Sequence, residues 1–381
     1  MSGDMVRRSV AAMLRNQDGG GAFVASPDFS QYHYCWLRDG SFTAYALDVA
    51  GEHAASARYH AWVGRAIAGI GGRIDAAIAR NREGGDLDPA RMPPARFALE
   101  GSVVADDWPN FQMDGYGTWL WALGQHLSRT GREDVPPELG VAVTRVARYL
   151  SEFAFAPCYD VWEESGTAVH TSTLSCVHGG LASAARLLRD PGLSERSDAV
   201  RSVVRDTAVR LGRYVKSSVS DEVDSSLLWL SVPFGVVDPL DPLLARTVGV
   251  IEERVTFEGG LRRYRGDTYF GSGAWPVLTA SLGCHHAAAG DAEAACRARD
   301  WVEAHFDDEG RLGEQFGGER RDEEHYKQWV ERWGPPAADL TWSHAMYVVL
   351  CAAIDTDVSA QLAAGMVSAS DRPSGDGLND G

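Results

Sequence analysis

The chain has 381 residues, of which 45% are hydrophobic and 23% charged, with a formal net charge of −17. This acidic balance argues against nucleic acid as a partner, because phosphate backbones select basic surfaces. No run approaches the roughly 20 apolar residues that a membrane helix needs, and the N-terminal segment is amphipathic, unlike the apolar core of a secretory signal. We therefore expect a cytoplasmic protein with no membrane partner, whose six scattered cysteines are free thiols.

Apolar residues recur with helical periodicity in one segment after another, whereas the two-residue alternation of strands is scarce. Gly and Pro pairs, such as Gly71-Gly72 and Pro335-Pro336, separate the segments. The last residues are mostly Ser, Asp, Gly and Pro, which predicts a disordered tail over 368–381. The predicted helices span residues 4–16, 38–50, 53–69, 114–130, 137–154, 172–189, 195–218, 239–254, 273–289, 291–305, 320–332 and 339–354.

Such a series of helices forms either an open solenoid or a closed α/α toroid. A solenoid would show a sequence repeat of fixed period, and none is visible. The loops between alternate helices are instead dense in Trp, Tyr, Asp and Glu, which suits a sugar pocket because aromatic rings stack on sugars while carboxylates accept their hydroxyls. With no compositional break in the middle, the sequence favours a toroid made of one domain over residues 1–367.

Two stretches in the first third of the chain combine aromatic and acidic residues ahead of a helix. In YHYCWLRD (32–39), the adjacent Arg38 and Asp39 can hold neighbouring sugar hydroxyls, although Asp39 could equally offset a helix dipole. In DDWPNFQMDGYG (106–117), a helix cap alone would explain Asp114. A cap would not explain the tryptophan and glutamine in the loop before it.

Three later stretches supply carboxylates and cations. The acids of DVWEE (160–164) surround a tryptophan, and their mutual charge would raise one pKa, as a general acid requires. A solvated helix start, the alternative, would rarely include tryptophan. Residues 262–276 gather cations, aromatics and glycines, as an ordinary surface loop also can. GRLGEQF (310–316) contains Glu314, which together with Glu163 supplies the carboxyl pair of glycoside hydrolysis.

In this order, the stretches resemble the glucoamylase family of inverting glycoside hydrolases, family fifteen, which includes glucoamylases, glucodextranases, isomaltose glucohydrolases and some trehalases. The resemblance extends from residue 23 to about residue 350. It implies an all-α fold, an (α/α)6 barrel of six helical hairpins whose active site lies in the loops at one end. The matching stretches are residues 34–39, 112–117, 160–164, 263–276, 314–316 and 339–343.

The resemblance also implies a role for each site residue. Glu163 matches the general acid, Glu314 the base that activates water, and Tyr32 a tyrosine that helps to position this water. No metal or organic cofactor is implied. The residues expected to bind the substrate are Trp36, Arg38, Asp39, Trp108, Asp114, Asp160, Trp162, Glu164, Arg263, Tyr269 and Trp275.

The implied function is that of an exo-acting α-glucosidase that releases β-glucose from the non-reducing ends of short isomalto- or malto-oligosaccharides. We expect a catalytic domain alone, because the first predicted helix begins at residue 4. Two alternatives stay open. A trehalase of the same family would be distinguished by loops 84–105 and 317–336, and a sugar-binding relative without activity is disfavoured by the presence of both Glu163 and Glu314. The preferred linkage stays open as well.

Overall fold

The computed structural model of the protein describes residues 2–317 and 322–355, so the tail predicted over 368–381 lies outside the described residues. Helices dominate the described part of the chain, as predicted. They are α1 (Ser2–Arg15), α2 (Leu37–Val49), α3 (His53–Gly69), α4 (Gly71–Arg82), α5 (Asp114–Arg129), α6 (Pro137–Phe153), α7 (Thr171–Leu188), α8 (Pro191–Thr207), α9 (Pro242–Val255), α10 (Pro276–Ala288), α11 (Ala292–Glu303), α12 (Glu323–Trp333) and α13 (Thr341–Ile354).

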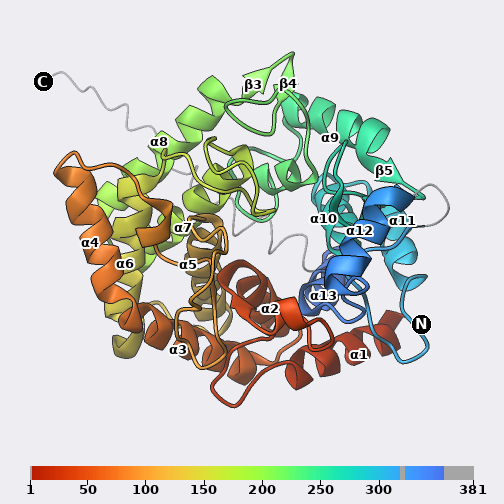
Figure 1. Cartoon of the computed structure of the whole chain (residues 1–381), viewed down its shortest axis with the longest axis horizontal. Coiled ribbons are helices and arrows are strands. Elements are labelled where there is room, and N and C mark those ends of the chain that lie inside the picture. Colours follow the sequence, from red (N-terminus) through yellow and green to blue (C-terminus); the bar gives the residue numbers. More distant parts are fainter. Residues whose placement is uncertain (1, 318–321, 356–381) are drawn as a thin grey trace, which may run out of the picture.

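Five of these helices and the short 3-10 helix η3 (Ser225–Leu230) form a closed inner ring. Packing follows the order α2, α5, α7, η3, α10 and α13, and α13 packs against α2 to close the ring. The outer helices α1, α3, α6, α8, α9 and α11 surround it (Figure 1). Each outer helix precedes an inner one along the chain, which gives six hairpins. The predicted (α/α)6 barrel is therefore confirmed, with a 3-10 helix as its fourth inner segment.

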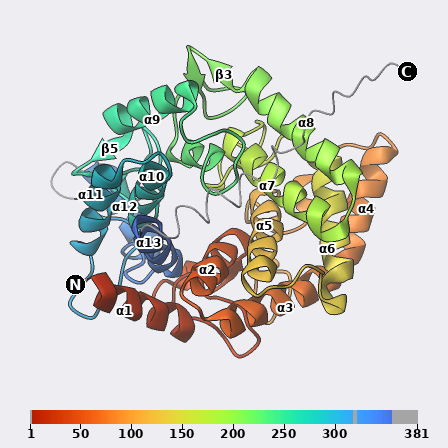
Figure 2. The same ribbon diagram turned by 180° about the vertical axis from the view of Figure 1, so that it is seen from behind.

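Burial explains which helices lie inside. In α7 and α13 nearly every residue is buried, as expected for helices covered on all sides. In α8 only Leu193, Ser197, Val200 and Val204 are buried, a single stripe at helical spacing. Figure 2 shows α8 and α4 at the periphery, where one face of each helix meets solvent. Helix α4 was not predicted.

Two glycines permit the close contact between the inner helices α5 and α7. A Cβ atom on Gly117 would lie 2.3 Å from the carbonyl oxygen of Cys176. A Cβ atom on Gly180 would lie 2.6 Å from the carbonyl oxygen of Gly117. These distances are far inside van der Waals contact, so any larger residue would push the two helices apart.

The prediction of one helix over 195–218 is wrong in its second half. Helix α8 ends at Thr207, and the chain turns at Leu211 and Gly212, whose φ angles are 57° and 72°. This turn joins β3 (Val209–Arg210) to β4 (Arg213–Tyr214), one of three two-stranded antiparallel sheets within residues 2–317 and 322–355. The others pair β1 (Cys35–Trp36) with β2 (Arg96–Phe97), and β5 (Thr256–Phe257) with β6 (Gly260–Leu261).

Two further expectations concern the cysteines and the membrane. All six cysteines are free thiols, as predicted, and five of them are buried. Among the described residues, every helix is too short or too polar to cross a membrane.

Candidate active site

A pocket of about 430 Å³ lies at the end of the barrel where the inner helices begin. Its walls come from the starts of α2 and α13, from the loops that precede α7 and α10, and from α12. Twelve of the fourteen predicted site residues line it. These are Tyr32, Trp36, Arg38, Asp39, Trp108, Trp162, Glu163, Glu164, Arg263, Tyr269, Trp275 and Glu314.

The other two predicted residues, Asp114 and Asp160, are buried behind the pocket wall. Asp114 is the first residue of α5, and its Oδ2 accepts a hydrogen bond of 2.8 Å from Arg38. Oδ1 of Asp160 accepts from the backbone amides of Trp162 and Glu164, both at 2.9 Å. Both carboxylates thus hold residues that line the pocket, which differs from the substrate contact predicted for them.

Glu163 occupies a tight turn whose backbone is strained. Its φ is 67°, a left-handed conformation that is uncommon outside glycine, and its amide donates to the carbonyl oxygen of Asp160 at 2.9 Å. Oε1 of Glu163 accepts from Trp36 Nε1 at 2.6 Å and from Gln112 Nε2 at 3.2 Å. Both donors meet the same oxygen, so Oε2 is the oxygen on which a transferable proton would sit.

Glu314 is 1% exposed. It is distant from Glu163 in the sequence, yet it lines the same pocket. The Tyr32 hydroxyl donates to its Oε1 at 2.7 Å and lies 2.6 Å from the hydroxyl of Tyr269. Among the described residues, none donates a hydrogen bond to Oε2 of Glu314. Burial raises the pKa of Glu314 to about 7, against the opposing effects of the Tyr32 hydrogen bond and the positive charge of Arg263.

Two cations neutralise the acids on either side of Glu163. Lys216 Nζ lies 3.3 Å from Oδ2 of Asp160 and 3.2 Å from Oδ2 of Asp224. Arg263 lies 3.2 Å from Oε1 of Glu164. The composition of residues 160–164 had indicated mutual repulsion among the acids. In the structure, the two cations offset the charges of Asp160 and Glu164. Lys216 and Asp224 were not predicted, because both lie in loops without a motif of their own.

Arg38 and Asp39 form the adjacent cation and carboxylate that the sequence predicted. Nε of Arg38 lies 3.3 Å from Oδ2 of Asp39, and both residues line the pocket at the start of α2. Burial raises the pKa of Asp39 to about 6, against the effect of the neighbouring guanidinium. The pair offers a planar set of donors next to an acceptor, which suits vicinal sugar hydroxyls.

Aromatic rings form much of the pocket wall. Trp36 and Trp108 meet edge to face with ring centroids 5.7 Å apart, and the guanidinium of Arg96 stacks 3.6 Å from the Trp108 ring. Trp162 and Trp275 lie on the pocket with centroids 6.1 Å apart. Such surfaces stack on the apolar faces of sugar rings.

Helix α12 contributes three lining residues that were not predicted individually, Trp329, Arg332 and Trp333. The Trp329 ring packs edge to face on Tyr269 with centroids 4.8 Å apart. Trp342, at the start of α13, also lines the pocket. The spacing of 329, 332 and 333 places the three α12 side chains on one helix face, which was the available signal. The sequence alone did not show which way that face pointed.

Comparison with known proteins places this geometry among glycoside hydrolases. Residues 1–302 match the model of the family "Glycosyl hydrolases family 15". The isomaltose glucohydrolase of Kribbella flavida is 38% identical over 354 residues, which are 91% of this chain and 91% of that protein. Glu314 lies beyond the residues that the family model matches.

Solved structures show the same fold. A glycosidase in complex with glucose is 36% identical and superposes with a TM-score of 0.88 over 92% of this chain and 96% of that chain. A bacterial glucoamylase complexed with acarbose, at 17% identity, superposes with a TM-score of 0.69 over 96% of this chain and 58% of that chain. The second likeness concerns the fold alone.

Proposed function

The chain belongs to the glycosyl hydrolases family 15 and is a glycoside hydrolase, and from this premise we propose that it removes single glucose units from the non-reducing ends of short α-glucosides. One observation supports the proposal above all others. Glu163 and Glu314 line one pocket from separate segments, and within the described part of the chain each keeps one carboxyl oxygen without a hydrogen-bond donor. Glycoside hydrolysis requires two such carboxyls.

Glu163 is the proposed general acid. Trp36 and Gln112 both donate to its Oε1 and so fix the carboxyl plane. A proton on Oε2 can then be transferred to the glycosidic oxygen as the bond to C1 breaks. The left-handed backbone at Glu163 holds this side chain in the turn that Asp160 closes.

Glu314 is the proposed general base. Its Oε2 would take a proton from a water that attacks C1 on the face opposite to the leaving group. Tyr32 holds Oε1 of Glu314, which orients the carboxylate, and its hydroxyl can also hold the water. An inverting mechanism places the two carboxyls about 6.5–9.5 Å apart to accommodate this water. The product of this step is β-glucose.

The preferred substrate that we propose is an α-1,6-linked disaccharide or short chain. The likeness to an isomaltose glucohydrolase over 91% of both chains supports this linkage. The pocket of about 430 Å³ is enclosed by elements from around the barrel mouth, which suits a chain end better than the middle of a polymer. Trp329, Arg332 and Trp333 line the same pocket and offer it further aromatic and cationic contacts for the substrate.

A panel of isomaltose, maltose, trehalose and longer chains tests this proposal through kcat/KM on each substrate. We expect isomaltose to give the highest value, little gain beyond a few glucose units, and negligible release from raw starch. Fastest cleavage of trehalose would establish the trehalase alternative instead. No cleavage of any member would contradict the proposal and favour a sugar-binding relative without activity.

A further inference from the structure

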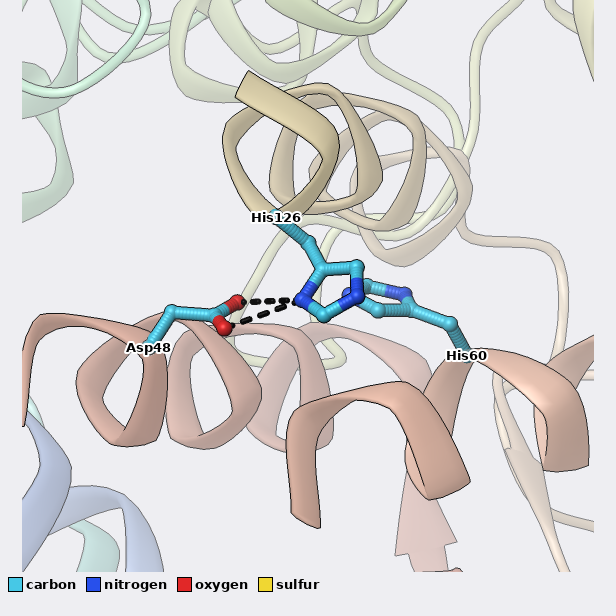
Figure 3. A group of neighbouring side chains, drawn as sticks. All are labelled: Asp48, His60 and His126. Carbon is cyan, nitrogen blue, oxygen red and sulfur yellow. Dashed lines mark hydrogen bonds and ion pairs between the residues drawn. The ribbon is translucent and has the colours of Figure 1, made fainter. Parts of the chain in front are cut away.

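Three helices bring two histidines and an aspartate together at the far end of the barrel. Asp48 lies near the C-terminal end of α2, His60 lies in α3, and His126 lies near the C-terminal end of α5. Figure 3 shows the three side chains meeting between these helices. One possible ligand atom from each lies within 4.8 Å of those of the other two. The spacing of these residues in the sequence gives no metal-binding pattern.

His60 is a buried histidine whose ring nitrogens lack hydrogen-bond partners within the part of the chain that the structure describes. The residue is 1% exposed, and neither ring nitrogen has a hydrogen-bond partner among the described residues. Its ring lies against that of His126, with centroids 5.1 Å apart. A buried polar group without a partner destabilises a fold, and such groups are rare unless an ion or another ligand satisfies them. The unsatisfied imidazole thus points to a ligand at this position.

Asp48 is already oriented by its neighbours. Its Oδ2 accepts from Ser56 Oγ at 2.6 Å, and its Oδ1 lies 2.8 Å from Nδ1 of His53 and 2.9 Å from Nδ1 of His126. The hydrogen bond from Ser56 supports this carboxylate from behind, as outer partners of metal ligands do, whereas the ion would replace the direct contact between Asp48 and His126. The C-terminal ends of α2 and α5 also favour a positive charge here.

We propose that Asp48, His60 and His126 bind one zinc-type divalent cation. Two imidazoles and one carboxylate suit zinc, cobalt or nickel rather than calcium or magnesium, which prefer oxygen ligands. Ligands of a tetrahedral zinc ion lie roughly 3.4 Å apart, given bonds of about 2.0–2.1 Å. On binding, the imidazole rings would have to rotate to close the remaining gap. The fourth position is left to water or to His53, whose half-exposed side chain gives access from solvent.

The ion would act as a structural clamp. It would join α2 and α5, neighbours in the inner ring, to the outer helix α3, at the end of the barrel away from the pocket. The three ligands come from residues 48, 60 and 126, so the bound ion would hold together segments of the first two hairpins. This site is separate from the chemistry proposed for Glu163 and Glu314.

Cobalt uptake by metal-free protein tests the proposal. Protein dialysed against a chelator is titrated with Co²⁺ and followed by visible absorption and by equilibrium dialysis. We expect one ion per chain, the intense bands of four-coordinate cobalt, and a higher melting temperature with Co²⁺ or Zn²⁺. The bands should be lost in His60→Gln and in His126→Gln. Ser56→Ala should keep them with an affinity about 10–100-fold weaker.

His286→Gln is the matched control, because His286 lies 3.1 Å from Glu252 on a different part of the molecule. It should bind cobalt as the original protein does. Absence of cobalt binding by the original protein, or equal binding by His60→Gln, would overturn the proposal. If the His60 and His126 variants fail to fold, X-ray absorption spectroscopy of the zinc-loaded original protein gives the number of imidazole ligands on the ion. At least two imidazole ligands are expected, and fewer than two would overturn the proposal.

Discussion

The hydroxyl of Tyr32 donates a hydrogen bond of 2.7 Å to Oε1 of Glu314, although 282 positions separate the two residues in the chain. Tyr32 lies between the first two helices, and Glu314 lies in the segment between α11 and α12. The contact exists because α13 packs against both α1 and α2 and so closes the ring. The proposed base is therefore held by the same packing that completes the barrel.

Replacement of either proposed catalytic acid by its amide should abolish turnover. Glu163→Gln removes the transferable proton, and Glu314→Gln removes the acceptor for the proton of water. We expect each change to lower kcat by several orders of magnitude with an unchanged circular-dichroism spectrum. Retention of more than about a tenth of the original turnover by either variant would refute the assigned roles.

The pH dependence of kcat/KM should report the ionisation of Glu314. A base must be ionised, and burial raises the pKa of Glu314 to about 7, so activity should fall as the pH drops below that value. The Tyr32 hydrogen bond lowers this pKa. Tyr32→Phe should therefore move the acidic limb to higher pH. Tyr34→Phe, which removes a hydroxyl outside the pocket lining, should leave the limb in place. A limb unmoved in Tyr32→Phe would contradict this account.

Glu314→Gln should stabilise the protein in a pH-dependent way. The pKa of Glu314 is about 7 in the folded chain against an ordinary value of 4.5, so the folded state binds more protons between these values and stability falls as pH rises. The variant has no carboxyl group at this position, so its folding carries no cost of ionising a buried carboxyl. Its gain in unfolding free energy should be small at pH 4 and reach up to about 3 kcal/mol at pH 8. Urea unfolding at both pH values measures it, and a gain independent of pH would disprove the explanation.

Lys216→Met should destabilise the protein strongly. The change leaves Asp160 and Asp224, both buried, without their shared cation. Removal of one partner from a buried ion pair costs about 3–5 kcal/mol. The chain's other lysine is a matched control, because Lys327 forms an exposed pair with Glu323 at 3.6 Å. Lys327→Met should change the unfolding free energy by less than about 0.5 kcal/mol. Equal effects of the two changes in urea unfolding would contradict the proposed contribution of Lys216.

Helix positions were predictable wherever a segment was long and clearly periodic. The predicted helix over 114–130 corresponds to Asp114–Arg129, and that over 339–354 to Thr341–Ile354. Periodicity failed where the apolar residues continued through a turn, as at Leu211, and where the inner segment Ser225–Leu230 was too short to show a period. Tertiary packing, rather than local propensity, determines the structure at both places.

The site was predictable where one stretch contained several of its residues. Trp162, Glu163 and Glu164 follow one another, and so do Arg38 and Asp39. The supporting residues were not predictable, because each depends on contacts between distant segments. Lys216 is an isolated lysine until the fold brings it to Asp160 and Asp224, and the α12 tryptophans line the pocket only through the placement of that helix.

The anomeric form of the first product tests the central claim most directly. A water activated by Glu314 attacks C1 opposite to the bond that Glu163 protonates, so an α-glucoside should yield β-glucose first. A retaining enzyme would instead form a covalent sugar ester and release α-glucose. Proton NMR of an isomaltose digest, recorded before the sugar mutarotates, separates the two anomers. Early β-glucose is the predicted result, and early α-glucose would contradict the assignment of Glu314 as the base.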